Sequence, residues 1–264
     1  MISRRVTRAT RALTCLWCLA WNFGSPPVPA EDLTPLDAKL PEDQETLIAC
    51  KMPAGVEPPK QDRPPGDIYH YRVYIPKGYY DNPTRRYPCL FNSSPGGNAA
   101  MGAMAARLKR DRWLAVLLVE SKNASYAWYQ SLLSSHDDAV QRLRILEGMK
   151  FTTGLSGGAR CASMHPGMRK GFRAAILQSA GFCPEREKVL AAFRENKSLM
   201  LYGTFGITDM NLHEALDVRR LVPAYTLRNV EVWQGGHEWA PAPVFERAMD
   251  WFDRKIFLEM KPDK

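Results

Sequence analysis

The sequence lacks the patterns of several common function classes. It has no His-Glu-x-x-His motif, and none of the four cysteines after residue 30 is spaced as a zinc ligand, so a metal site has no support. It has no dense block of lysine and arginine, which nucleic-acid binding would require. Its N-terminal apolar run, residues 12–21, is too short for a stable membrane span. We therefore expect no metal, no nucleic-acid partner and no stable span.

Residues 1–30 have the order of a secretory signal peptide. A basic start with four arginines and no acid precedes the apolar run, and small residues at 28–30 follow it. Cleavage after residue 30 would lower the formal net charge from +8 to +4, because those four arginines would leave. We expect a secreted, periplasmic or cell-envelope protein, with a single N-terminal anchor as the alternative.

Four cysteines remain after the signal peptide: Cys50, Cys89, Cys161 and Cys183. In an exported chain they permit two disulfides, in three possible pairings. A bridge between Cys161 and Cys183 is favoured, because the segments that carry them should lie close together. Buried free thiols are the alternative for each.

The rest of the chain divides into two parts. Residues 31–66 are rich in proline and charge, which predicts an extended linker or a segment wrapped on the surface. Residues 67–264 are long enough for one α/β domain with a sizeable core.

A glycine-flanked serine stands at the centre of this domain. Gly154, Ser156 and Gly158 fit Gly-x-Ser-x-Gly, the nucleophile elbow, in which a strained turn between a strand and a helix presents the serine. A coincidental Gly/Ser turn is the alternative. The motif needs a strand before it and a helix after it. The order of strands and helices around it therefore decides between an elbow and a coincidental turn.

That order fits. Residues 69–75 alternate with period two and predict an antiparallel edge strand, whereas the continuous apolar run at 113–119 predicts a strand buried on both faces. A helix is expected at 137–146. Further strands are expected at 87–91, 151–155, 172–181, 198–203 and 229–233. We predict a mostly parallel twisted sheet with helices on both faces, and no large lid, because the segment between 181 and 198 is short.

Partners for the serine follow the last two strands. Asp209 lies in the loop after 198–203, and His237 lies on a glycine-rich loop after 229–233. An acid that orients a histidine, and a histidine that activates a serine, belong at these places. Helix capping is the alternative for Asp209, and Asp217 and Glu214 are the alternative acids.

Two further groups complete the predicted site. Backbone N–H donors for a developing oxyanion are expected from Gly157 and from the loop at 94–98, where Pro95 has no N–H and Gly97 is chosen. Tyr126, Trp128 and Tyr129 are expected in a loop at the carboxyl end of a strand, where they would form a substrate platform. Packing against the next helix is their alternative.

Three segments carry a resemblance to a known family: Gly-Leu-Ser-Gly-Gly-Ala-Arg at 154–160, Ser-Pro-Gly-Gly at 94–97 and Gly-Gly-His-Glu-Trp at 235–239. They resemble α/β-hydrolases, and more closely exported bacterial esterases of the polyhydroxybutyrate-depolymerase and feruloyl-esterase type. The likeness spans residues 69–257, although Ser94 and Pro95 replace the His-Gly of many relatives.

The resemblance implies hydrolysis of small or polymer-borne esters, such as feruloyl, acetyl or hydroxyalkanoate esters. It implies an acyl-enzyme formed on Ser156 and no cofactor. A serine peptidase on the same fold, and a non-catalytic envelope or carbohydrate-binding protein that retains the fold, are the alternatives.

Overall fold

The computed structural model of the protein describes residues 33–259. The predicted signal peptide, residues 1–30, lies outside them. Within the described residues, no helix is both long and apolar enough to cross a membrane.

The domain is built on one eight-stranded sheet. Its strands are β1 (Glu45–Lys51), β2 (Ile68–Tyr74), β3 (Tyr87–Ser93), β4 (Leu114–Leu118), β5 (Ile145–Leu155), β6 (Phe172–Gln178), β7 (Met200–Gly206) and β8 (Arg228–Trp233). The α-helices are α1 (Ala105–Arg110), α2 (Trp128–Arg142), α3 (Gly157–Met168), α4 (Arg186–Glu195), α5 (Ala215–Arg220) and α6 (Ala242–Glu259). Short 3-10 turns are η1 (Pro65–Asp67), η2 (Gly102–Met104) and η3 (Leu212–Glu214).

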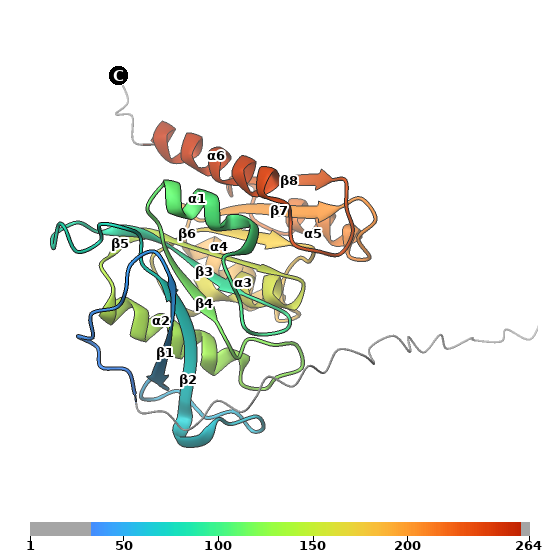
Figure 1. Ribbon diagram of the computed structural model, residues 1–264. Helices are drawn as coiled ribbons and strands as arrows, with labels where there is room; N and C mark the ends of the chain where they lie inside the picture. Colours follow the sequence, from blue (N-terminus) through green and yellow to red (C-terminus); the bar gives the residue numbers. More distant parts are fainter. Residues whose placement is uncertain (1–32, 260–264) are drawn as a thin grey trace, which may run out of the picture.

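The strands lie in the order β1-β2-β4-β3-β5-β6-β7-β8 (Figure 1). β2 is antiparallel to both of its neighbours, and every pair from β4 to β8 is parallel. The carboxyl ends of these parallel strands therefore meet at one edge of the sheet, where α/β proteins bind their ligands. The predicted fold class, a mostly parallel sheet in an α/β domain, is confirmed.

Helices cover both faces of the sheet, as predicted. Alternate residues of β4 show the two cores: Leu114, Val116 and Leu118 pack on the side of α2, α3, α4 and α5, while Ala115 and Leu117 pack on the side of α1 and α6. All five are fully buried. A strand with an apolar layer on each face has no polar positions, which explains the continuous apolar run in the sequence.

The N-terminal segment differs from the prediction. Residues 45–51, expected within a linker, form β1 and extend the sheet beyond β2, so the predicted edge strand is not at the edge. The flanking residues are also held: Thr34 exchanges two hydrogen bonds with Ala49, and the Arg142 guanidinium of α2 donates to the Thr34 carbonyl. The prolines around β1 hid it, because they are typical of extended linkers.

The helix before the elbow also differs from the prediction. It runs from Trp128 to Arg142 as α2, and β5 already begins at Ile145. Val140 and Leu146, both within the predicted helix 137–146, are exposed, and Leu146 belongs to the strand. β5 is long, and its first half extends past β6, with which it pairs only from residue 150.

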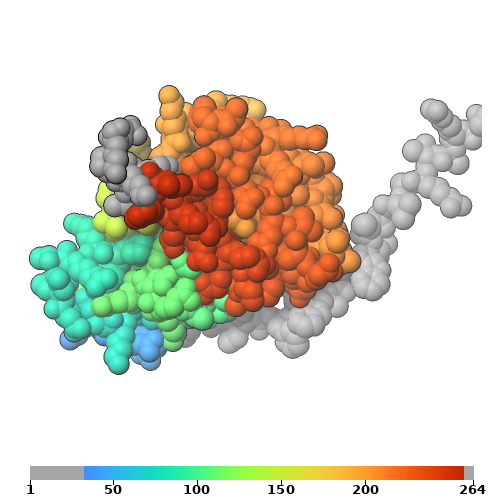
Figure 2. All heavy atoms as spheres, turned by 90° about the horizontal axis from the view of Figure 1, so that it is seen from above, coloured from blue at the N-terminus to red at the C-terminus, as the bar shows by residue number. Residues whose placement is uncertain are grey.

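The C-terminal helix α6 closes the second core. Arg107 of α1, 5% exposed, is held by four acids. Asp111 directly follows α1, and Glu246, Asp250 and Asp253 come from α6. Figure 2 shows α6, in red, packed between the green segment that contains α1 and the orange segment of β7 and β8. The last helix is thereby joined to the first.

The four cysteines of the domain are free thiols, and the favoured bridge between Cys161 and Cys183 is absent. Both residues do line the same cavity, so the expectation that their segments approach one another holds. Burial raises the pKa of Cys161 to about 12, which keeps it a neutral thiol at ordinary pH.

Candidate active site

The turn between β5 and α3 places Ser156 in a strained conformation, with φ 52° and ψ −119°. Its neighbours have to be glycine because of close approach. A Cβ at Gly154 would lie 2.3 Å from the carbonyl of Gly158, and a Cβ at Gly158 would lie 2.2 Å from the carbonyl oxygen of Ser93 in β3. The two glycines let the elbow press against the neighbouring strand, and the serine side chain is thereby held at the carboxyl edge of the sheet.

Three predicted residues meet at this edge. His237 Nε2 lies 2.9 Å from Ser156 Oγ, and His237 Nδ1 lies 2.8 Å from Asp209 Oδ1. The histidine side chain is 24% exposed and that of Asp209 is fully buried. Because the carboxylate can only accept, Nδ1 carries the proton and donates it, which leaves Nε2 to accept from the serine hydroxyl.

Asp209 is not the helix N-cap that was its alternative, because the N-cap of η3 is Asn211, but its side chain does hold the turn before η3. Its Oδ1 accepts a hydrogen bond of 2.8 Å from the backbone N–H of Asn211, at the start of the turn that leads to η3. The same oxygen therefore holds both the turn and the imidazole. The turn thereby fixes the carboxylate that faces the histidine.

The alternative acids are engaged elsewhere. Asp217 pairs with Arg186 at 2.8 Å on the surface. Glu214 pairs with Arg160 at 2.6 Å and accepts from the Gly181 N–H at 2.7 Å. Burial opposes ionisation of Glu214, but the bonds from Arg160 and Gly181 outweigh it and lower the pKa of its carboxyl. Neither acid is bonded to His237.

Gln178 at the end of β6 supports both the serine and the histidine loop, and the sequence did not identify it. Its carbonyl accepts from the Ser156 N–H at 2.9 Å, and its side-chain Oε1 accepts from the Ala240 N–H at 3.1 Å. Its Nε2 donates to Thr153 Oγ1 at 3.0 Å. One buried amide thus ties the elbow strand to the segment that follows His237.

The acid loop is tied to the histidine loop through Ser179. The Asn211 side chain donates to the Ser179 carbonyl at 2.9 Å, and Ser179 Oγ donates to the Glu238 carbonyl at 3.2 Å. These bonds fix the spacing between Asp209 and His237. Only their position in the fold identifies Ser179 and Asn211, since neither stands in a motif.

Of the two predicted oxyanion donors, Gly157 has an available N–H and Gly97 does not. Gly157 begins α3, where a backbone N–H has no partner within the helix. Gly97 does not fit its predicted role, because its N–H donates to the Ser94 carbonyl at 3.1 Å within a turn. Among the described residues, the N–H of Gly96 has no protein acceptor and that of Ser94 has only Ser121 Oγ, at 3.4 Å. These two are the available donors of the loop.

Two cavities flank the elbow. One, of about 210 Å³, is mainly apolar and is lined by Ser94, Asn98, Ala100, Met101, Gly102, Ala103, Met104, Gln178, Trp239 and Ala240. The other, of about 180 Å³, presents amine, amide and guanidinium groups beside an indole and is lined by Lys122, Asn123, Ala124, Trp128, Gly157, Arg160, Cys161, Cys183 and Pro184. Gly157 of the elbow lines the second cavity, and Ser94 and Gln178, which contact the elbow, line the first.

The predicted aromatic platform is only partly formed. Trp128 lines the second cavity, but Tyr126 and Tyr129 line neither. Both tyrosines are exposed, and the Tyr126 N–H is held by Asp62. Trp128 and Tyr129 are the first two residues of α2 rather than part of a loop, so the helix orients the two rings differently.

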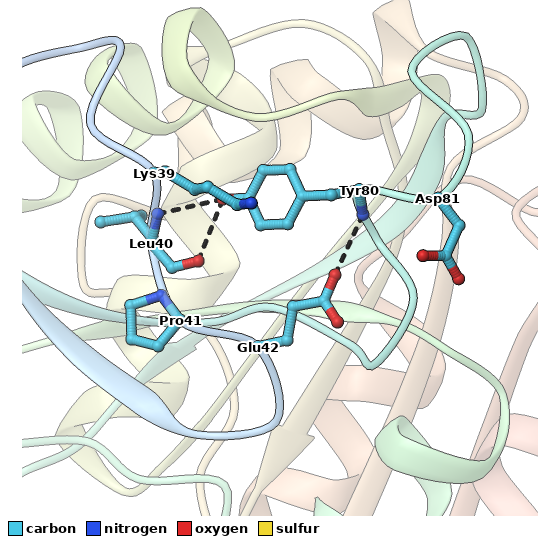
Figure 3. A pocket seen from close by; sticks show the side chains of 6 residues that line it. All are labelled: Lys39, Leu40, Pro41, Glu42, Tyr80 and Asp81. Atoms are coloured by element: carbon cyan, nitrogen blue, oxygen red, sulfur yellow. Dashed lines mark hydrogen bonds between the residues drawn. The ribbon is translucent and has the colours of Figure 1, made fainter.

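A larger hollow, of about 540 Å³, lies at the other edge of the sheet (Figure 3). Tyr80 and Glu42 line it, and Glu42 accepts from the Tyr80 N–H at 3.0 Å. These segments adjoin the end of β2, which pairs with the start of β4, so they lie at the opposite edge from the serine. This hollow takes no part in the site.

No family model matches the sequence, and no curated protein has a matching sequence. Solved structures do match: a fluorophosphonate-binding serine hydrolase of Staphylococcus aureus, FphF, superposes with a TM-score of 0.59 at 14% identity, over 79% of this chain and 98% of that chain. The chain has the α/β-hydrolase fold.

Other structures with this fold are similar to the chain to the same degree. An S-formylglutathione hydrolase of Staphylococcus aureus has a TM-score of 0.57 at 14% identity, over 81% of this chain and 98% of that chain. A ferulic acid esterase has a TM-score of 0.55 at 15% identity, over 80% and 98%. At identities this low, the structural similarity establishes the α/β-hydrolase fold alone. The chemistry has to be argued from the residues at the site.

Proposed function

We propose that the protein is a serine hydrolase that cleaves carboxylic esters through an acyl-enzyme. The chain of hydrogen bonds from Ser156 Oγ through His237 to Asp209 carries this proposal. An isolated serine hydroxyl is a weak nucleophile, and a neighbouring imidazole with its tautomer fixed by a buried carboxylate activates it.

In the first half of the reaction, Ser156 Oγ attacks the ester carbonyl carbon while His237 Nε2 takes the hydroxyl proton. The imidazolium is stabilised by Asp209, and the tetrahedral intermediate collapses as His237 returns the proton to the leaving alcohol. In the second half, His237 takes a proton from water, the resulting hydroxide attacks the acyl carbon, and the proton restores Ser156 as the acid leaves.

The negative charge that develops on the carbonyl oxygen needs preorganised donors. We assign the Gly157 N–H as one donor and the N–H of Ser94 or Gly96 as the other. Ser94 follows β3, and its N–H lies 3.0 Å from where a Cβ on Gly158 would stand, so the loop directly adjoins the elbow. Loss of one such donor typically costs about 3 kcal/mol of transition-state stabilisation.

Two observations support ester hydrolysis. The similar structures include one named a ferulic acid esterase and one named a thermostable esterase, the latter with a TM-score of 0.55 at 19% identity, over 80% of this chain and 63% of that chain. The chain also has no inserted domain between β6 and β7, where only α4 intervenes. We propose that the signal-like residues 1–30 direct this esterase out of the cytoplasm.

The test is ester turnover by the purified protein and by Ser156→Ala. With p-nitrophenyl acetate and butyrate, the wild type should hydrolyse at least one ester, and Ser156→Ala should lose at least about a thousandfold in kcat. A folded Ser156→Ala protein that keeps its activity would overturn the proposal. Feruloyl esters and acetylxylan, assayed in parallel, distinguish an aromatic from a polymer-borne substrate.

A further inference from the structure

A side chain from another loop fills the space beside the nucleophile where Gly157 has none. Asn123 lies on the loop between β4 and α2. A Cβ built on Gly157 would lie 1.7 Å from Asn123 Oδ1 and 3.3 Å from Asn123 Nδ2. The amide therefore lies over the first residue of α3, directly after Ser156, and occupies the position of a side chain at residue 157.

The loop that carries Asn123 is fixed to the oxyanion loop. The Asn123 N–H donates to the Pro95 carbonyl at 2.7 Å, and the Asn98 N–H donates to the Val119 carbonyl at 2.9 Å. These bonds join the segment after β4 to the segment after β3. Asn123 is thus held between the two segments that supply backbone donors.

The side-chain amide is not used by the protein. No hydrogen bond joins it to any other residue of the described chain, although an asparagine amide offers two N–H donors and an accepting oxygen. Asn123 is exposed, and because no other residue holds its amide, rotation can bring Nδ2 rather than the nearer Oδ1 toward an oxygen atom of a ligand. Its neighbours in the cavity, Lys122 and Arg160, are also donors.

We propose that the Asn123 side chain is a further hydrogen-bond donor to the reacting carbonyl oxygen of the ester, alongside the Gly157 N–H. This inference rests on the proposed function, because it needs an acyl group on Ser156. Donors aimed at the oxygen stabilise the charge of the transition state more than they stabilise the neutral ester. Asn123 should therefore affect kcat more than KM.

Two substitutions and a matched control test this role. Asn123→Ala removes the amide, and Asn123→Asp keeps its shape but replaces its donors with a negative charge. Asn82→Ala is the control, because Asn82 is an asparagine in an exposed turn at the opposite edge of the sheet. We expect losses in kcat of about 10- to 100-fold for Asn123→Ala and more for Asn123→Asp, with the control within twofold.

A transition-state analogue separates this role from a structural one. An alkyl boronic acid, which forms a tetrahedral adduct on a serine, should bind Asn123→Ala more weakly by the same factor as the loss in kcat/KM. Circular dichroism confirms folding. If Asn123→Ala keeps both kcat/KM and boronate affinity within twofold of wild type, Asn123 is not a donor to the reacting oxygen.

Gly157→Ala provides an independent test. Its methyl group would collide with the amide and displace it, so the loss should resemble that of Asn123→Ala, and the double variant should be no worse than either single one. Additive losses would overturn the proposal. If the wild type itself hydrolyses no ester and Ser156 does not react with a fluorophosphonate, the proposed function fails instead.

Discussion

Asp209 and His237, 28 residues apart in the chain, are joined by a single 2.8 Å hydrogen bond between Oδ1 and Nδ1. The carboxylate is fully buried, while the imidazole is accessible. Such a pair fixes the histidine tautomer and leaves its other nitrogen free to exchange protons with the serine and the substrate. The hydrogen bond to His237 also distinguishes Asp209 from the alternative acids, Asp217 and Glu214.

The first prediction concerns that acid. Asp209→Asn keeps the shape of the side chain but removes the charge and favours the wrong imidazole tautomer, so kcat should fall by about a thousandfold or more. Asp217→Asn is the control, since Asp217 bonds to Arg186 on the surface. Its kcat should stay within twofold of wild type in an ester assay. The reverse pattern would show that Asp217 is the acid.

The second prediction concerns the oxyanion loop. Gly97 has φ +70°, and a Cβ there would lie 2.4 Å from the Val119 carbonyl oxygen, so Gly97→Ala should lower the free energy of unfolding by about 1–3 kcal/mol. Gly96 has open space around it and no positive φ. Gly96→Ala should change stability by less than about 0.5 kcal/mol. Urea unfolding measures both, and equal effects would refute the difference between the two glycines.

The third prediction concerns the attachment of α6. Arg107→Met leaves Asp250 and Asp253 of α6 without their cation, whereas Glu246 keeps its ion pair with Arg110. Because these acids are partly exposed, the expected loss is about 2–3 kcal/mol, less than for a fully buried pair. Arg254→Met, which replaces an exposed arginine of α6, should lower the free energy of unfolding by less than about 0.5 kcal/mol. Chemical denaturation of the two variants against wild type decides.

The fourth prediction concerns stability at low pH. Burial holds the pKa of His165 well below its usual range, and the charges of His136, Lys150 and Arg169 add to this effect. Burial also lowers the pKa of His136. Both imidazoles bind protons less readily in the folded protein than in the unfolded chain, which takes them up below about pH 6.5. The stability they contribute is therefore complete above that pH and is lost as the pH falls.

His165→Leu tests this dependence. Between pH 6 and 5 the free energy of unfolding should fall less steeply than in wild type. The two slopes should differ by about 1.4 kcal/mol per pH unit. Replacing the exposed His213 by leucine should leave the slope unchanged. An unaltered slope in His165→Leu would show that this histidine is already protonated in the folded protein.

Much of the site could be predicted from the sequence, because each part carries a local signal. The glycines around Ser156 reflect a close approach of backbone, and Asp209 and His237 stand in loops directly after strands. The order of strands then brings these loops to one edge of the sheet. Local pattern and topology are sufficient for these three residues.

Other features depend on contacts that no local pattern contains. The N–H of Gly97, the predicted oxyanion donor, already donates within its own turn, which only the fold reveals. The strand β1 was hidden by the prolines around it, and its place is set by pairing with β2. Gln178 and Asn123 are single amides outside any motif, and their importance comes from the distant segments that they contact.

Labelling with a fluorophosphonate probe tests the central claim most directly. The probe reacts covalently only with a serine made nucleophilic by its surroundings, so peptide mass spectrometry of the labelled wild type should find one adduct, on Ser156. Ser156→Ala should not be labelled, and His237→Ala should be labelled far more slowly. An unlabelled but folded wild-type protein, or an adduct on another residue, would contradict the account.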